Sequence, residues 1–361
     1  MMLNKRNLLF SAMMIAIFQL SPGDNFLFAQ VDPTELEFGS NVSRRGTTAA
    51  AMLEIGVGAR AVALGNAFVA TADDPSALYW NSAGSVQLRN FALQATKTEW
   101  LVGTNFSTVD MVVPMPSFSS ALGFHLAVLD YGENPVRTVT RPEGTGELYS
   151  AMDYVAGLYW ALSITDRVSV GLGLKYFHEN IWHVNGSAVA GDLGILFKTP
   201  LQGLRLGGTL SNLGPEFGLS GRDLTRIADV DGRRDVYYNN NNVAIDYATQ
   251  TYGLPLMFRF GVAYEQTISD KSSLTFAGNV NHPSNDVETI DLGMEARVFN
   301  MIFMRAGYRS LFSDVAEDGL TLGGGINYKI AGGALITVDY AWADWGLLSN
   351  VNRFTIGISA Y

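Results

Sequence analysis

The sequence has no cysteine, few charged residues and no long apolar run beyond its first thirty residues. Without cysteine, neither a disulfide nor a lipoprotein anchor can form, so packing and hydrogen bonds must hold the fold together. A membrane-spanning helix needs about 20 consecutive apolar residues, which excludes a helical membrane protein after residue 30. Only 16% of the 361 residues are charged, whereas 48% are hydrophobic. Such a chain has either a large buried β core or the architecture of a membrane β-barrel.

Basic residues and catalytic motifs are also scarce. The 24 Lys and Arg residues stand against 34 Asp and Glu, a formal net charge of -10, which disfavours binding to nucleic-acid phosphates. The chain shows no Ser-His-Asp order, paired-carboxylate site, phosphate-binding loop or metal cluster. We therefore expect no enzymatic activity, no cofactor, no metal and no nucleic-acid partner.

The first 29 residues have the pattern of a secretory signal peptide. Lys5 and Arg6 precede an apolar run over 8–20, and Ala29 offers a small residue for cleavage. The sequence therefore predicts export, with residues 1–29 removed.

From about residue 91 onward, apolar residues recur at every second position, which is the spacing of a β-strand. The ranges 168–176, 256–265, 291–298 and 302–309 approach the roughly nine to eleven residues that a tilted membrane strand needs. The opposite face carries glycine and isolated charges, and the apolar face ends in aromatics: Tyr176, Tyr264, Tyr308 and Trp342. A soluble sandwich also alternates, but aromatic girdles around a polar lumen favour an all-β transmembrane antiparallel barrel.

About fourteen strands can be placed, an even number as bacterial barrels require. Their connections alternate between short and long, which puts both ends of the barrel in the periplasm and the long loops, chiefly 131–150 and 212–255, outside. The predicted strands are 91–97, 105–113, 121–130, 151–162, 168–177, 189–198, 204–211, 256–265, 273–280, 290–298, 301–309, 319–330, 334–342 and 352–361.

The stretch 54–84 is apolar, rich in small residues and too broken by glycine for one long helix. Asp74 can cap a helix that has Pro75 at its first position, continues over 76–82 and stops at Gly84. Small residues allow close backbone approach, so we expect 30–90 to form a lead-in and a partly helical plug. The barrel is then 91–361.

Several stretches resemble one family. GVGARAVALGNAFVATADDPSALYWNSAG, VRTVTRPEGTG from residue 136, LGGTLSNLGP from 206 and RAGYRSLF from 305 are similar to PorV/PorQ proteins, relatives of the FadL long-chain fatty-acid transporters. The resemblance implies a fourteen-stranded barrel with an N-terminal plug in the outer membrane of a Gram-negative bacterium. It departs from the FadL type at 81–84, where Asn-Ser-Ala-Gly replaces Asn-Pro-Ala-Gly.

Two functions are compatible with these features. The resemblance implies a type IX secretion shuttle or scaffold, whose outer loops bind cargo C-terminal domains and PorU-like or PorZ-like attachment proteins. The alternative is a FadL-like channel in contact with outer-membrane lipid that takes up fatty acids or other hydrophobic molecules, with a gap in its wall near an early strand.

Three groups of residues are candidate sites. The plug motif comprises Gly56, Gly58, Arg60, Gly65, Asp73, Asp74, Pro75, Asn81 and Gly84. Charges on the lumen face of the strands either line a conduit or, as we favour, pair across strands and onto the plug; they are Arg259, Glu265, Glu295, Arg297, Arg305 and Arg309. Candidate partner-binding residues in the outer loops are Arg137, Arg141, Glu143, Arg222, Asp223, Arg233 and Arg234.

Two apparent metal motifs are disfavoured. His178 and His183 are five apart, so on a strand they would face opposite sides. The stretch 229–235 resembles a calcium loop, but Arg233 occupies its fifth position, where an oxygen ligand is required.

Overall fold

The computed structural model describes residues 44–229, 242–313, 316–330 and 333–360. The predicted signal peptide, the first part of the lead-in, and Arg233 and Arg234 lie outside the described residues.

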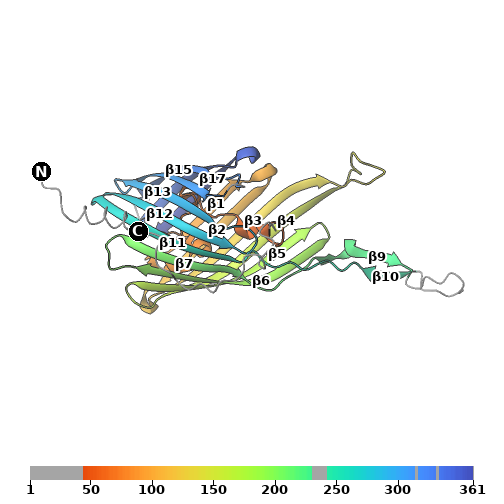
Figure 1. The fold of residues 1–361 in the computed structure, drawn as a ribbon, viewed down its shortest axis with the longest axis horizontal. Helices are drawn as coiled ribbons and strands as arrows, with labels where there is room; N and C mark the ends of the chain where they lie inside the picture. Colours follow the sequence, from red (N-terminus) through yellow and green to blue (C-terminus); the bar gives the residue numbers. More distant parts are fainter. Residues whose placement is uncertain (1–43, 230–241, 314–315, 331–332, 361) are drawn as a thin grey trace, which may run out of the picture. The chain divides into compact units, whose positions relative to one another are not determined.

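Fourteen antiparallel strands close into a barrel, as the sequence predicts (Figure 1). Each strand pairs with its neighbour in the chain, β7 pairs with β11 across the longest loop, and β1 pairs with β17 to close the sheet. The barrel strands are β1 (Ala92–Glu99), β2 (Asn105–Met115), β3 (Ser120–Pro135), β4 (Leu148–Ser163), β5 (Val168–Ile181), β6 (Val184–Lys198), β7 (Leu204–Leu213), β11 (Met257–Ser269), β12 (Ser272–Pro283), β13 (Thr289–Val298), β14 (Ile302–Leu311), β15 (Leu320–Ile330), β16 (Ala334–Asp344) and β17 (Asn350–Ala360).

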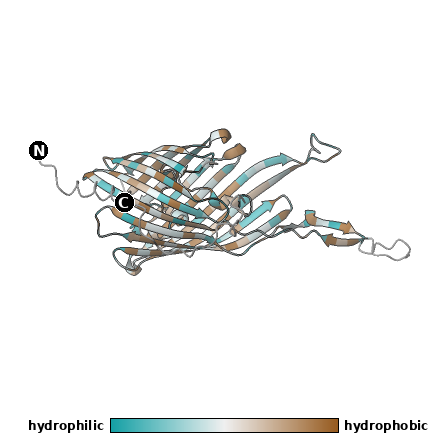
Figure 2. Cartoon of the chain, in the orientation of Figure 1, coloured by the Kyte–Doolittle hydropathy of each residue, from teal (hydrophilic) through white to brown (hydrophobic). Residues whose placement is uncertain are grey.

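The side chains alternate across the wall as predicted. On β5, Leu172 and Leu174 are 47% and 60% exposed on the outside, whereas Lys175 and Phe177 are buried on the inside. Apolar positions recur along the strands (Figure 2). An apolar exterior of this kind is stable against lipid. None of the described helices is long and apolar enough to cross a membrane.

Strands β3 to β6 extend further than predicted. The ladder between β3 and β4 continues to the pair Pro135 and Leu148, and β5 pairs with β6 as far as Ile181 and Val184. Most of 178–188 and both ends of 131–150 are therefore strand rather than loop. The prediction ended the strands where the apolar pattern ends, but backbone pairing continues through polar residues beyond it.

The long connection 212–255 also contains structure that was not predicted. β8 (Ser220–Gly221) adds to β6, and β9 (Thr225–Ala228) pairs with β10 (Val243–Asp246) in a separate hairpin. This hairpin projects away from the barrel (Figure 1). Its strands are too short to give a clear periodic signal.

The plug is formed by four short helical turns: η1 (Ala51–Glu54), α2 (Ala59–Ala63), α3 (Ala77–Trp80) and η2 (Ser82–Gln87). The helix predicted over 76–82 is too long. The observed helix, α3, ends at Trp80, and Asn81 has an extended backbone. The Asn81 amide donates to the carbonyls of Val69 and Ile195 at 2.9 and 3.0 Å, which holds it out of the helix. Gly84 lies within η2 rather than stopping a helix.

Glycines on the lumen face allow the plug backbone to touch the wall. A Cβ on Gly307 of β14 would lie 2.1 Å from the Gly65 nitrogen of the plug. Gly65 has φ +64°, and a Cβ there would lie 2.7 Å from the Tyr308 nitrogen. The glycine-rich lumen face seen in the sequence is thus the seat of the plug.

Candidate functional site

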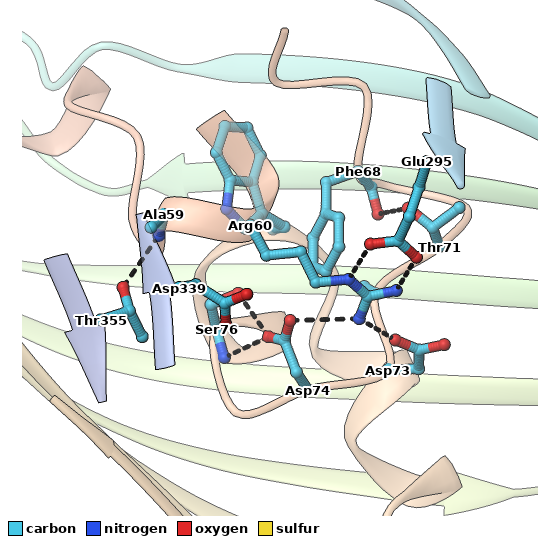
Figure 3. Close-up of polar contacts among 12 residues, drawn as sticks. Ala59, Arg60, Phe68, Thr71, Asp73, Asp74, Ser76, Glu295, Asp339 and Thr355 are labelled. Carbon is cyan, nitrogen blue, oxygen red and sulfur yellow. Dashed lines mark hydrogen bonds and ion pairs between the residues drawn. The ribbon is translucent and has the colours of Figure 1, made fainter. Parts of the chain in front are cut away.

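Arg60 on α2 is the main charged contact between the plug and the wall. Its Nε and Nη2 donate to the two carboxylate oxygens of Glu295 on β13, at 2.9 and 3.0 Å. Its Nη1 donates to Asp73 and Asp74 within the plug, at 2.5 and 3.3 Å (Figure 3). The Phe68 ring lies 5.3 Å from the guanidinium carbon. Arg60 therefore links two plug carboxylates to a wall carboxylate.

The wall extends this group of charges across three strands. Glu295 also accepts from Arg305 Nε on β14 at 2.6 Å, and Arg305 Nη1 donates to Asp339 on β16 at 2.5 Å. These three wall residues are buried. Each buried charge thus has an opposite partner, which offsets its loss of hydration.

Two acidic groups of the plug have shifted pKa values. Burial raises the pKa of the Asp74 carboxyl, although the charge of Arg60 and a hydrogen bond from Ser76 partly oppose the shift. Burial likewise raises the pKa of Glu54, against a hydrogen bond from Asn285 and the charge of Arg259.

The other predicted lumen charges differ in their pairing. Arg297 contacts Glu265 at 2.9 Å, and Arg309 contacts Asp318 at 2.9 Å. Arg259 is different. It is only 6% exposed, yet no carboxylate oxygen of the described residues lies within 4.0 Å of its guanidinium nitrogens, the distance that defines an ion pair.

Sequence reasoning missed several buried polar groups on the lumen face. Lys175 pairs with Asp192 at 2.9 Å, and Asp192 also accepts from the Tyr159 hydroxyl at 3.2 Å. His125 contacts Asp110 at 2.6 Å. The inward phase of each strand would have identified them, because their neighbours two positions away also face the lumen.

Among the described residues, two cavities border the plug inside the lumen, and each is lined by both polar and apolar side chains. The inner one measures about 300 Å³ and is lined by Arg60, Glu265, Arg297 and Arg305, among others. The outer one measures about 400 Å³ and is lined by Glu54, Trp80, Arg259 and Asp291, among others. We call the second one the outer chamber.

The outer half of the lumen wall over β2 to β6 carries a cluster of apolar side chains between buried charges such as Asp153 and Lys175, which the sequence did not predict. Plug residues and two residues of the 212–255 loop cover it and exclude water. We call this surface the apolar inner wall; it consists of Phe106, Ala127, Leu129, Val155, Phe177, Ala188 and Ala190, covered by Ala50, Met52, Leu53, Ile55, Val57, Phe217 and Leu254.

All residues of the predicted plug motif lie in one compact body inside the barrel. Gly58, with φ +81°, precedes α2 and so orients Arg60. Pro75 lines the inner cavity, whereas Gly56 packs against Trp80. Gly84 packs against the Ala72 carbonyl, where a Cβ would lie 1.9 Å away.

The predicted outer-loop residues lie on two different loops. Arg137, Arg141 and Glu143 are exposed at the tip of the β3–β4 connection. Arg222 and Asp223 lie before β9 and both contact His183, at 2.8 and 3.0 Å.

Neither apparent metal motif gains support. His178 lies on β5 rather than in a loop, and His183 lies in the turn after that strand. Among the residues that the structure describes, no group of three His, Asp or Glu side chains could hold a metal ion. Of the apparent calcium loop, only Asp229 lies within the described ranges.

Comparison with known proteins identifies the fold. No family model matches the sequence, and no curated protein matches it. Among solved structures, the deltaS2S3 mutant of the TodX monoaromatic hydrocarbon channel matches with a TM-score of 0.51 and 13% identity, covering 84% of this chain and 99% of that chain. The Ralstonia pickettii toluene transporter TbuX (TM-score 0.48, 13% identity, 84% and 97% covered) and a Pseudomonas aeruginosa FadL homologue (0.49, 12%, 82% and 96%) also match.

These findings confirm part of the sequence-based prediction. A closed fourteen-stranded barrel with an apolar exterior is the architecture of bacterial outer-membrane proteins, which confirms the predicted location in the outer membrane of a Gram-negative bacterium. The PorV/PorQ resemblance stays a prediction. The chain is an outer-membrane β-barrel that shares its fold with a hydrocarbon channel.

Proposed function

We propose that this protein is a conduit that carries hydrophobic molecules across the outer membrane. The observation that carries the proposal is the apolar inner wall, since the lumen of a membrane barrel is ordinarily polar. The shared fold with a monoaromatic hydrocarbon channel supports the same function. No catalytic step is part of the proposal.

The cover of the apolar inner wall suits a gated route. Met52 and Leu53 belong to the short turn η1, and Phe217 and Leu254 belong to the loop that follows β7. A displacement of these segments would open an apolar path, which a hydrophobic molecule could enter in place of the covering side chains.

The wall itself has no break near an early strand of the described barrel. β2 pairs with β3 along its whole length, and the β3–β4 ladder changes register only between Asp130 and Glu133. The gap expected for an uptake channel is therefore not present in this structure. In our proposal the molecule passes along the lumen, past the plug.

Ala190→Trp is expected to lower transport of naphthalene into proteoliposomes at least about tenfold, because the indole would block the path along the apolar inner wall. Naphthalene entry can be followed by its fluorescence. Val189→Trp is the matched control, since Val189 is 48% exposed on the lipid side of the same strand. Equal transport by both folded variants, or no transport by the wild type, would reject the conduit.

We also propose a second candidate function, a scaffold for cargo C-terminal domains and PorU-like or PorZ-like proteins. The β9–β10 hairpin favours it, because within the described ranges both strands pair only with each other and so leave two edges for a partner.

Deleting residues 221–246 is expected to leave the barrel folded and to abolish partner binding, because the described strands β9 and β10 form no ladder with the barrel and the deletion removes a single pair, Gly221 with Val184, from the edge of β6. Co-purification from the native outer membrane measures the binding, and the heat-dependent shift of the barrel on gels measures folding. Partners that remain bound to the deletion variant would contradict this function.

A further inference from the structure

The outer chamber lies between the plug and the outer ends of β11 to β14, and Trp100 and Trp345 of two other connections complete its lining. Its lining includes three tryptophans, Trp80, Trp100 and Trp345. Trp100 and Trp345 meet edge to face with ring centroids 5.1 Å apart. A volume of about 400 Å³ suits a small organic ligand.

Arg259 gives this chamber a buried cation that makes no contact ion pair within the described residues, although the charge of Glu54 acts on it from across the chamber. The guanidinium carbon lies 5.6 Å from the Tyr79 ring and 5.4 Å from the Trp80 ring, and the residue lines the chamber. The chamber's other ion pairs, Arg309 with Asp318 and Arg45 with Asp286, do not involve it. A guanidinium has five N–H donors, and aromatic faces do not replace the paired oxygens of a carboxylate.

Two acidic groups face the same chamber without a cationic partner. Glu54 accepts a hydrogen bond from Asn285 at 3.2 Å, and Asp291 accepts from Asn281 and from the Ser310 backbone at 2.7 and 2.9 Å. In the described part of the chain, neither carboxylate lies within 4.0 Å of a Lys, Arg or His nitrogen. The lining therefore holds one cation, Arg259, and three carboxylates, Glu54, Asp291 and the exposed Glu317, that make no contact ion pair in the described part of the chain.

We propose that the outer chamber binds a zwitterionic aromatic amino acid. Its carboxylate pairs with Arg259, its ammonium group pairs with Glu54 or Asp291, and its ring packs against the tryptophans. Such a ligand supplies a contact partner of opposite charge both to Arg259 and to a carboxylate of the chamber, which neither a hydrocarbon nor a simple carboxylate does. The chamber adjoins the cover of the apolar inner wall at Ile55 and Trp100, but the proposal does not depend on the proposed conduit.

Four indole compounds test the site by calorimetry on the full-length protein in detergent. We expect tryptophan to bind at least about tenfold more tightly than tryptamine, which lacks the carboxylate, or indole-3-propionate, which lacks the ammonium group. Indole itself should bind most weakly. Equal affinities for indole and tryptophan, or no binding of tryptophan to the folded barrel, would overturn the proposal.

Three variants separate the roles of the charges. Arg259→Met should weaken tryptophan binding about tenfold but leave tryptamine binding unchanged. At least one of Glu54→Gln and Asp291→Asn should weaken the binding of tryptamine but not that of indole-3-propionate, and no effect of either would overturn the ammonium contact. Arg297→Met, which removes a guanidinium from the inner cavity instead, serves as the control and should alter none of these affinities. If Arg259→Met lowers the affinity for all four compounds equally while the melting temperature is unchanged, the contact between Arg259 and the ligand carboxylate is refuted.

Discussion

Gly307→Ala is expected to displace the plug from the wall and to lower the melting temperature of the barrel sharply. The new Cβ would lie 2.1 Å from the Gly65 nitrogen, 2.4 Å from the Leu64 carbonyl carbon and 2.7 Å from the Gly65 Cα. All three are backbone atoms, so no side-chain rotation can relieve the overlap. Overpacking in a tight interior costs about 1–3 kcal/mol, and contacts with rigid backbone lie at the upper end or beyond.

Thermal unfolding by circular dichroism and limited proteolysis of the plug measure these effects. Gly324→Ala is the matched control on the adjacent strand, because its Cβ would face lipid with its nearest atom 3.4 Å away. A Gly307→Ala barrel with wild-type melting and a protease-resistant plug would show that the plug does not rest against this glycine.

Arg60→Met is expected to destabilise the seated plug by about 3–5 kcal/mol, the usual cost of removing one partner of a buried ion pair. The substitution leaves Asp73, Asp74 and Glu295 without their shared cation, and the Arg60 and Glu295 side chains are only 19% and 8% exposed. Glu295→Gln should cost less, because Arg60 keeps two plug carboxylates and Arg305 keeps Asp339.

Denaturant unfolding of the single and double variants gives these differences and the coupling between Arg60 and Glu295. Arg45→Met is a suitable control, since Arg45 and Asp286 are 43% and 38% exposed and such surface pairs contribute little. Strictly additive effects of Arg60→Met and Glu295→Gln would mean that the two side chains do not stabilise each other.

The strand pattern could be predicted because it is local. On β14, the alternation of Ile302 and Met304 with Arg305 fixes which side chains face lipid and which face the lumen, since successive residues on a strand point to opposite sides. The same regularity predicted fourteen strands and the closed barrel. It placed the charged residues inside but did not supply their partners.

The end of the plug helix and the pairing of the lumen charges depended on contacts between residues distant in the chain. Asn81 ends its helix because Ile195, 114 positions later, accepts its hydrogen bond, and Arg60 pairs with Glu295 across 235 positions. The absence of an ion pair at Arg259 could not be foreseen either, because the partners of a lumen charge depend on where the plug lies. Sequence by itself therefore determined which residues face inward, through a periodicity of two; only the tertiary structure decided which of them meet, because the closed barrel brings together side chains that no local pattern connects.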